Sequence, residues 1–285
     1  MTRLTEMHIQ EAEEQLQRID LELSARARTD LRGVALRTIG IEDDRTGELP
    51  QGSRLAVVPI TSGEGIILGF AEAVCSIAAH VGFNAWKTSG SDVAGMAEAY
   101  ANAADILILA DDYRFVAINT RSRSLTDNNR ATGEGFAVLL DMMARGVSGR
   151  ACGVIGCGPV GSASALRLAQ MGAKLTVCDV NEDRACHLAS EIRAVTGMNI
   201  RWVREVEALT ASSGCIVDAT PASRIIDADA VGPDTVIVAP GIPHGLTPEA
   251  LTRIGPRFYH DVLPLGMATM ALAAAFDQLT ETANL

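Results

Sequence analysis

The sequence predicts an α/β protein of two domains. Short apolar runs with the length and β-branched composition of buried strands alternate with longer amphipathic segments, and this alternation is typical of parallel sheets covered by helices. At 285 residues the chain is long for one compact domain and sufficient for two, each with its own core. We expect a smaller N-terminal α/β domain with a leading helix over residues 1–132, and a second α/β domain over 133–285.

The most informative motif lies at the start of the second domain. An apolar run, Ala151–Ile155, leads into glycines at G-x-G-x-x-G spacing, and an amphipathic segment, Pro159–Met171, follows. In such a strand, turn and helix, the first glycine permits the turn, the second lets the backbone approach a pyrophosphate, and the third lets the helix pack close to the strand. This order predicts a Rossmann-type, doubly wound nucleotide-binding domain. The candidate cofactor contacts in the turn are Gly156, Cys157, Gly158, Pro159, Val160 and Gly161.

An acidic residue specifies the nucleotide. A second apolar run, Lys174–Cys178, ends at Asp179, about 20 residues after the glycines, where a carboxylate accepts both ribose hydroxyls of NAD and disfavours the 2′-phosphate of NADP. We therefore predict NAD as the cofactor. The alternative is an ordinary α/β turn followed by a surface aspartate.

Later strands of this domain end in turn-forming residues. In open parallel sheets, ligands lie outside the carboxyl ends of the strands. Strands expected at 215–220 and 236–239 end beside Thr220, Pro221, Pro240 and Gly241, which we place beside the nicotinamide. A last strand is expected over Phe258–Leu263, before an apolar helix, Leu265–Leu279, that packs on either domain or in a homodimer.

The N-terminal domain begins with an amphipathic helix, Thr5–Ala27, whose narrow apolar stripe indicates a surface helix. After a polar loop at 42–53, a strand, Arg54–Ile60, runs through Thr61, Ser62 and Gly63 into a helix expected over Ile66–Val81. Hydroxyls and N–H groups at a helix N-terminus suit a substrate carboxylate or amide oxygen. An ordinary helix cap is the alternative.

Two further strands are expected at 83–88 and 105–110, separated by a helix that Ser91 caps. The second of these strands ends at Asp111 and Asp112, adjacent carboxylates that hold either a cationic substrate group or a loop, or form a solvated pair. The polar stretch 113–132 lacks periodicity and is long for a connection, so we interpret it as a functional loop. A helix over 133–146 is expected to lead into the second domain.

Composition argues against several classes of protein. The net charge of −11 disfavours binding to nucleic acid or an anionic membrane, and no uncharged apolar run reaches the roughly 18 residues of a membrane span. The six cysteines form no CxxC pair, and the N-terminus lacks the pattern of a secretory signal, so we expect a reducing, cytoplasmic location. No metal-binding or serine hydrolase motif is found. His244 and His260 are candidate acids or bases, but a structural role is the simpler interpretation.

Several stretches together resemble the pyrrolysine synthase family. They are Leu4-Thr5, VVPITSGEGII at 57–67, ILILADD at 106–112, DNNRATG at 127–133, VIGCGPVG at 154–161, DATPA at 218–222, APGIP at 239–243 and PLG at 264–266. The resemblance implies an NAD-dependent enzyme that oxidises the terminal amine of (3R)-3-methyl-D-ornithyl-N6-L-lysine. The imine is then hydrolysed to an aldehyde with loss of ammonia, and the ring closes to L-pyrrolysine.

The resemblance also implies site residues. Leu4, Ser62, Asp111 and Asn128 match the substrate contacts of the family, and Leu4 lies on a leading helix that closes over the site. We add Thr61 from the same loop. Hydride leaves only from the carbon of a neutral amine, so a carboxylate has to orient the substrate ammonium while a base takes a proton; Asp111 is our choice for that contact.

One position departs from the family. A glutamate that takes part in the family's active site is Leu263 here. Because residues two apart on a strand share a face, we expect Asp261 to point toward the same site, with His260 or a chain of waters as alternatives for the missing acid. The departure also leaves open a dehydrogenase of another small amine or amino acid. An NAD-sensing binding protein without turnover is a third hypothesis.

Overall fold

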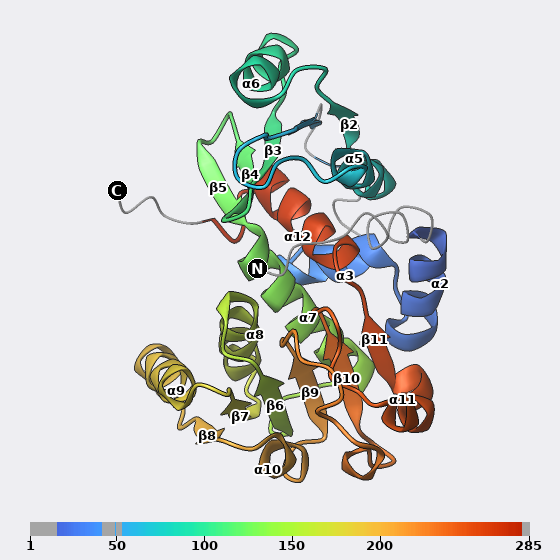
Figure 1. Ribbon diagram of the computed structural model, residues 1–285, viewed down its shortest axis with the longest axis vertical. Helices are drawn as coiled ribbons and strands as arrows, with labels where there is room; N and C mark the ends of the chain where they lie inside the picture. Colours follow the sequence, from blue (N-terminus) through green and yellow to red (C-terminus); the bar gives the residue numbers. More distant parts are fainter. Residues whose placement is uncertain (1–15, 42–48, 50–52, 281–285) are drawn as a thin grey trace. The chain divides into compact units, whose positions relative to one another are not determined.

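The structure is a computed structural model that describes residues 16–41, 49 and 53–280 (Figure 1). The chain forms two compact units. The first unit joins residues 1–132 to residues 263–285, and the second unit contains residues 133–262. The boundary falls inside one helix, α7 (Asn128–Ala144). The α/β fold class that the sequence predicts is confirmed in both units.

The first unit is built on a mixed sheet of five strands in the order β2-β1-β3-β4-β5. Strands β1 (Arg54–Val58), β2 (Asn84–Lys87) and β3 (Ile106–Ala110) are parallel and are linked by α5 (Phe70–His80) and α6 (Asp92–Ala101). These three strands are confirmed to within a few residues of the prediction. Strands β4 (Phe115–Asn119) and β5 (Ser124–Asp127) extend the sheet with antiparallel pairing.

The predicted functional loop at 113–132 is therefore wrong. Its residues form β4, β5 and the first turn of α7. Val116 and Ala117 are adjacent and both buried, so β4 lacks the alternation of apolar and polar residues that identifies a half-buried strand. The polar residues of this stretch also suggest a solvated loop, whereas several of them form hydrogen bonds within the unit.

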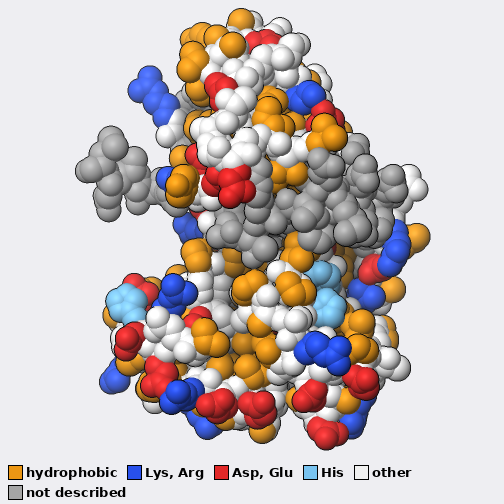
Figure 2. Space-filling view, in the orientation of Figure 1, with side chains coloured by type: hydrophobic (Ala, Val, Ile, Leu, Met, Phe, Trp, Pro, Cys, Tyr) orange, Lys and Arg blue, Asp and Glu red, His pale blue; other side chains and the backbone are white. Residues whose placement is uncertain are grey.

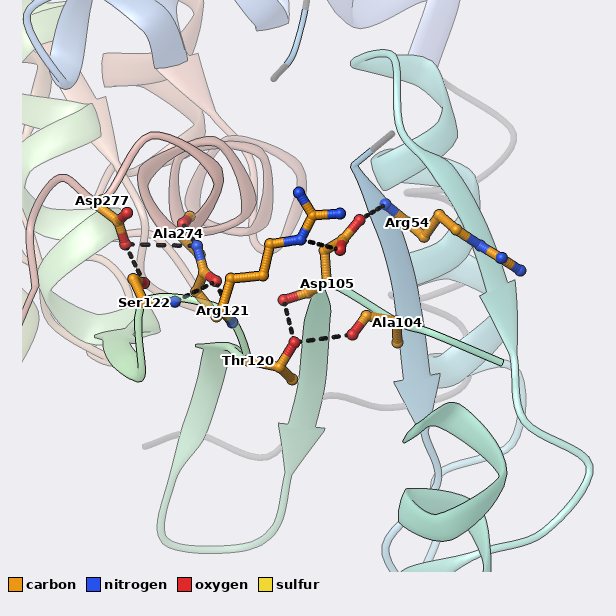
Figure 3. A network of polar contacts seen from close by, with 9 residues as sticks. Arg54, Ala104, Asp105, Thr120, Arg121, Ser122, Ala274 and Asp277 are labelled. Carbon is orange, nitrogen blue, oxygen red and sulfur yellow. Dashed lines mark hydrogen bonds and ion pairs between the residues drawn. The ribbon is translucent and has the colours of Figure 1, made fainter. Parts of the chain in front are cut away.

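Figure 3 shows one set of these contacts, at the end of the last helix, α12 (Pro264–Ala275). The amide of Asn119 donates to the carbonyl oxygen of Ala274 over 2.9 Å, and Ser124 donates to the Asp277 carboxylate over 2.8 Å. Ser122 donates to the same carboxylate oxygen. The hairpin of β4 and β5 is thus fastened to α12 through polar side chains.

A second set of contacts joins the amino ends of the central strands (Figure 3). The Asp105 carboxylate accepts from the Arg54 N–H over 2.9 Å and pairs with the Arg121 guanidinium at 2.6 Å. The Thr120 hydroxyl donates to the carbonyl oxygens of Ala104 and Asp105. Asp105 therefore fixes β1 and β3 at the end of the sheet opposite Asp111.

Helices at both ends of the chain complete the first unit. In α2 (Leu16–Ala27), Leu16, Ile19 and Leu23 are buried, which confirms the described part of the predicted apolar stripe. Helix α3 (Leu31–Thr38) begins where Asp30 accepts from the Gly33 N–H. Helix α12 is buried from Pro264 to Ala274 and packs on α3, α5 and strands β3, β4 and β5. The sequence left its location open, and in the structure it is part of the first unit.

The second unit is a parallel sheet of six strands in the order β11-β10-β9-β6-β7-β8, the doubly wound order with its reversal between β6 and β9. The strands are β6 (Ala151–Ile155), β7 (Lys174–Cys178), β8 (Arg201–Val203), β9 (Cys215–Asp218), β10 (Val236–Ala239) and β11 (Phe258–His260). Helices α8 (Pro159–Gln170) and α9 (Glu182–Thr196) lie beside β6 and β7 (Figure 1). The predicted Rossmann-type topology is confirmed.

Short helical segments in this unit were not predicted. They are α10 (Val206–Thr210), α11 (Pro248–Ile254) and the 3₁₀ turns η1 (Ala228–Ala230) and η2 (Gly255–Arg257). Helices α10 and α11 bury Leu209, Ala250 and Ile254 in the sheet core. With so few apolar residues each, they show no helical period in the sequence.

The visible surface of the second unit carries acidic and basic side chains interspersed, without a patch of one sign (Figure 2). Within the part of the chain that the structure describes, no helix has the length and apolarity to cross a membrane.

Candidate active site

The glycine turn connects β6 to α8, and two of its glycines are required by the protein itself. Gly156 has a φ of +92°, and a Cβ there would lie 2.8 Å from the carbonyl oxygen of Ala219. A Cβ on Gly161 would overlap the carbonyl oxygen of Gly156. These two residues therefore allow the turn and the close packing of helix on strand.

Gly158 is different, because the protein alone gives no reason for a glycine there. Its φ of −74° and ψ of −176° suit any residue, and no atom lies within 4 Å of a Cβ built on it. Gly158 caps α8, whose first helical residues are Pro159 and Val160. Open space against the unsatisfied N–H groups of a helix start suits a pyrophosphate. The open space at Gly158 thus leaves room for a dinucleotide at the turn.

Asp179 lies directly after β7 and is held against the glycine turn. One carboxylate oxygen accepts from the Cys157 N–H over 2.7 Å, and the other accepts from the Asn181 N–H over 2.8 Å. Burial and the neighbouring Asp179 raise the pKa of the Cys157 thiol to about 12, so this cysteine is unreactive at neutral pH. The next side chain, Val180, is fully exposed. Asp179 is itself buried, with both carboxylate oxygens bonded to backbone N–H groups.

The loops after β9 and β10 form one packed assembly. A Cβ on Gly241 would overlap the carbonyl oxygen of Thr220, so the loop at Pro240 lies directly on the loop at Pro221. Asp218, which is completely buried, accepts from the Thr220 hydroxyl over 2.8 Å and from the Gly245 N–H over 2.6 Å. Burial raises the pKa of Asp218, while these hydrogen bonds oppose the rise.

His260 ends β11 and is held by its neighbours. Its Nδ1 lies 2.7 Å from the Ala239 carbonyl oxygen; since a carbonyl only accepts, this nitrogen carries the proton. The His244 ring stands edge-on to His260 with 5.3 Å between centroids, and Phe258 stacks on His260 at 6.2 Å. Burial, and then the neighbouring His260, lower the pKa of His244, so it is neutral at pH 7.

The strand ends at His260, so the expectation that Asp261 and Leu263 share one face of a strand is wrong. Asp261 is buried, and its carboxylate accepts from the Tyr259 hydroxyl over 2.8 Å. Leu263 is also buried, with a backbone φ of −147° and ψ of −48° immediately before α12. The chain turns there because Pro264 begins α12 and strand pairing has stopped.

In the first unit, the loop at 61–63 does not lie at a helix N-terminus, and that expectation is also wrong. Helix α5 begins at Phe70, after Gly69. Gly63, Gly65 and Gly69 all have positive φ values, and this left-handed backbone breaks the helix that the apolar residues after Gly65 suggest. The loop lies instead between two carboxylates from other elements.

Asp92, at the start of α6, binds one side of this loop. Its carboxylate accepts from the Thr61 N–H over 2.9 Å and from the Thr61 hydroxyl over 2.6 Å. Asp112 binds the other side, where it accepts from the Glu64 N–H over 2.7 Å. Ser62 lies between these anchors. It is exposed, and it makes no hydrogen bond within the described residues.

Asp111 is exposed in the turn between β3 and β4. One of its oxygens accepts from the N–H groups of Tyr113 and Arg114, over 2.8 and 2.7 Å. This fixes the carboxyl group, as a residue that orients a cation requires. Arg114 in turn lies 3.5 Å from the buried Asp127.

Asn128 is the first residue of α7. Its side-chain oxygen is buried, with no hydrogen-bond partner in the described part of the chain. A Cβ on Gly266 would lie 3.3 Å from that oxygen, which places Asn128 beside the PLG segment of α12. Leu4 lies outside the described residues.

The structure thus brings Thr61, Ser62, Asp112 and Asp92 together in the first unit, and Gly158, Asp179 and Cys157 in the second. Sequence reasoning missed the anchoring carboxylates Asp92 and Asp218. Asp92 lies in the first turn of a predicted helix, and Asp218 lies near the end of a predicted strand. No His, Cys, Asp or Glu cluster of metal-binding type occurs in the residues that the structure describes.

Comparisons with known proteins show what the chain is similar to. Residues 8–126 match the family model of the N-terminal domain of the pyrrolysine biosynthesis protein PylD. The chain is 28% identical to the pyrrolysine synthase of Methanosarcina acetivorans over 90% of this chain and 96% of that protein. It is 26% identical to the pyrrolysine synthase of Methanosarcina barkeri over 90% of this chain and 91% of that protein.

Solved structures show the same fold. Quinate dehydrogenase from Corynebacterium glutamicum, in complex with NAD, has a TM-score of 0.55 at 17% identity and covers 80% of this chain and 95% of its own. A shikimate dehydrogenase in complex with NADP⁺ has a TM-score of 0.55 at 15% identity, over 81% of this chain and 91% of its own. The sequence comparisons confirm the resemblance seen in the sequence: the chain is similar to the pyrrolysine synthases, and residues 8–126 match the family model of an N-terminal domain.

Proposed function

We propose that this protein is an NAD-dependent oxidoreductase of pyrrolysine biosynthesis. In this proposal it oxidises the terminal amine of (3R)-3-methyl-D-ornithyl-N6-L-lysine, and the product closes to L-pyrrolysine. The observation that carries the proposal is the glycine turn. The space at Gly158 serves no packing purpose in the protein, and Asp179 is fixed 2.7 Å from the turn's Cys157 N–H. In a relative of the pyrrolysine synthases, a dinucleotide site of this form supports a dehydrogenase.

The choice of NAD over NADP depends on charge. Asp179 directly follows β7, and its carboxylate would repel a 2′-phosphate while accepting ribose hydroxyls. Bound NAD would supply the hydride acceptor. The residues that would hold it are Gly156, Cys157, Gly158, Pro159, Val160, Gly161 and Asp179, with Thr220, Pro221, Pro240 and Gly241 beside the nicotinamide.

The chain's own residues would prepare the amine. Asp111, whose carboxyl group is fixed by two N–H groups, would orient the substrate ammonium. Ser62 and Asn128 would bind polar groups of the isopeptide, and the buried unpaired oxygen of Asn128 suits an N–H donor. Loss of a proton makes the amine neutral, and hydride then leaves its carbon to give an imine. Water adds to the imine, ammonia leaves, and the remaining amine closes the ring.

A second candidate is a dehydrogenase of another small amine or amino acid. Leu263 favours it, because this buried apolar residue replaces the acid that the family carries before PLG. Asp261, bound to Tyr259, and His260, bound to Ala239, are the proposed replacements as base. A cytoplasmic location and a homodimer stay predictions.

Purified protein, NAD and the synthetic isopeptide test the proposal. We expect NADH to appear at 340 nm together with a product of the mass of pyrrolysine, and NADP to be a much weaker cofactor. Asp111→Asn should lower kcat/KM by about a hundredfold, the order of effect of a positioned charged contact. NADH formed only with other amines would favour the second candidate. No turnover with any amine, despite tight NAD binding, would indicate the NAD-sensing protein instead.

A further inference from the structure

The adjacent carboxylates Asp111 and Asp112 have different structural roles, although the sequence does not distinguish them. Asp111 accepts from N–H groups of its own turn. Asp112 reaches the separate segment after β1, where it accepts from the Glu64 N–H over 2.7 Å. The second carboxylate therefore joins the turn after β3 to the Thr61–Glu64 loop.

The loop is shaped to receive this carboxylate. Gly63 has a φ of +73°, and a Cβ there would overlap the Asp112 carboxylate oxygen. Only glycine meets both conditions without strain. The fit between Gly63 and Asp112 indicates that the contact determines the conformation of the loop.

Asp92 holds the preceding residue with two hydrogen bonds, from the Thr61 N–H and the Thr61 hydroxyl. These bonds lower the pKa of Asp92, so it is fully ionised at neutral pH. Its backbone has a φ of +50°, a conformation that costs energy in residues other than glycine. The hydrogen bonds from Thr61 to the Asp92 carboxylate offset this conformational cost.

We propose that Asp92 and Asp112 are positioning residues that fix the Ser62 hydroxyl for the substrate. Ser62 and Gly63 are the two residues between the anchored Thr61 and Glu64, and Ser62 is exposed. A hydroxyl on a loop fixed at both sides binds a ligand without first losing loop freedom. This inference rests on the proposed function and names two residues that act through Ser62.

A double-mutant cycle tests the inference. Asp112→Ala, Ser62→Ala and the double variant are titrated calorimetrically with the isopeptide in the presence of NADH, using the full chain. If Asp112 acts through Ser62, each single variant raises the Kd about tenfold, the size of one lost hydrogen bond. The double variant also raises it about tenfold, because nothing remains to position. The same cycle with Asp92→Ala should give the same result.

Two further variants separate positioning from stability. Asp112→Asn keeps an oxygen for the Glu64 N–H and should restore the Kd to within about twofold of wild type. Asp105→Ala is the matched control: it removes a carboxylate that accepts a backbone N–H, that of Arg54 over 2.9 Å, at the opposite end of β1 and β3. It should lower the melting temperature without changing the Kd. NAD affinity should be unchanged in every variant.

The experiment distinguishes failure of the inference from failure of the proposed function. A hundredfold loss in the double variant means that Asp112 and Ser62 act independently, which overturns the inference and leaves the proposed function intact. A weakened Kd in Asp105→Ala equal to that of Asp112→Ala also overturns it. Wild-type protein that binds NAD but not the isopeptide overturns the proposed function, and the inference with it.

Discussion

At the scale of single residues, Gly158 separates ligand binding from folding. Ala at this position meets no atom and needs no unusual backbone. We expect Gly158→Ala to change the free energy of unfolding by at most about 0.5 kcal/mol, as for an unconstrained surface site. Its methyl group would occupy the space of the pyrophosphate and lower NAD affinity at least about tenfold. Thermal unfolding and fluorescence titration with NADH measure the two effects.

Gly161→Ala is the control for this prediction. Its Cβ would overlap the Gly156 carbonyl oxygen, so the variant should be destabilised by about 1–3 kcal/mol or more. If Gly158→Ala binds NAD as wild type does, the turn at 156–161 does not hold a pyrophosphate.

We predict that His244 makes the stability of the protein depend on pH. Its pKa in the folded protein is lowered, first by burial and then by His260, and Asp218 acts against this shift. A lowered pKa means that the unfolded chain takes up the proton more readily. The contribution of His244 is therefore complete above its ordinary pKa of 6.5 and is lost as the pH falls below that value, by at most about 1.4 kcal/mol per pH unit.

His244→Phe should reduce this loss, since phenylalanine takes up no proton and suits a site against Phe258. Urea unfolding at pH 7.5 and 5.5 gives the comparison. His187→Gln, at a histidine exposed on α9, is measured in parallel as the comparison variant. An unreduced loss in His244→Phe contradicts the assignment.

At the scale of elements, Asp277 fastens the hairpin of β4 and β5 to the end of α12. Its carboxylate accepts from Ser122 and Ser124, and its φ is +52°. Asp277→Ala loses these bonds and places alanine in a left-handed conformation, so we expect a loss of about 1–2 kcal/mol. Asp277→Gly loses only the bonds and should lose about 1 kcal/mol less. Equal stability of both variants and wild type in urea would refute the role of Asp277.

The same hairpin shows where sequence reasoning stopped. The strands of the second unit are continuous apolar runs between glycines and prolines, so Ala151–Ile155 and Val236–Ala239 were predicted with their observed bounds. Strand β5 contains only four residues, SLTD, and its Ser124 side chain bonds to Asp277, 153 residues later in the chain, a partner that no local pattern reveals.

For the candidate site, the sequence likewise identified single residues but not their distant partners. Residues that end strands, such as Asp179 and Asp111, were identified because strand ends can be recognised in sequence. The partner of each residue could not be identified, because it comes from another element. Asp111 accepts from N–H groups of its own turn, whereas Asp112 accepts from Glu64 of another segment. Asp261 was misplaced because the pairing of β11 with β10 ends at His260.

At the scale of the whole molecule, the two units differ in how the chain builds them. The second unit is one continuous segment, residues 133–262, and contains the complete sheet and glycine turn. The first unit needs both ends of the chain, because α12 supplies a helix that is buried from Pro264 to Ala274. Burial of one aliphatic side chain contributes about 1.5–3 kcal/mol, and α12 buries several of them. A first unit without α12 therefore loses more free energy than its net stability of folding.

We therefore expect residues 133–262, expressed alone, to fold and to bind NAD with an affinity within about tenfold of the full chain, as calorimetry and circular dichroism would measure. Residues 1–132 alone should be unfolded, whereas residues 1–132 joined through a flexible linker to 263–285 should unfold cooperatively. The linked fragment with Leu272→Asp is the matched control, since it places a charge in the buried face of α12. A cooperatively folded 1–132 fragment would show that α12 is dispensable for the first unit.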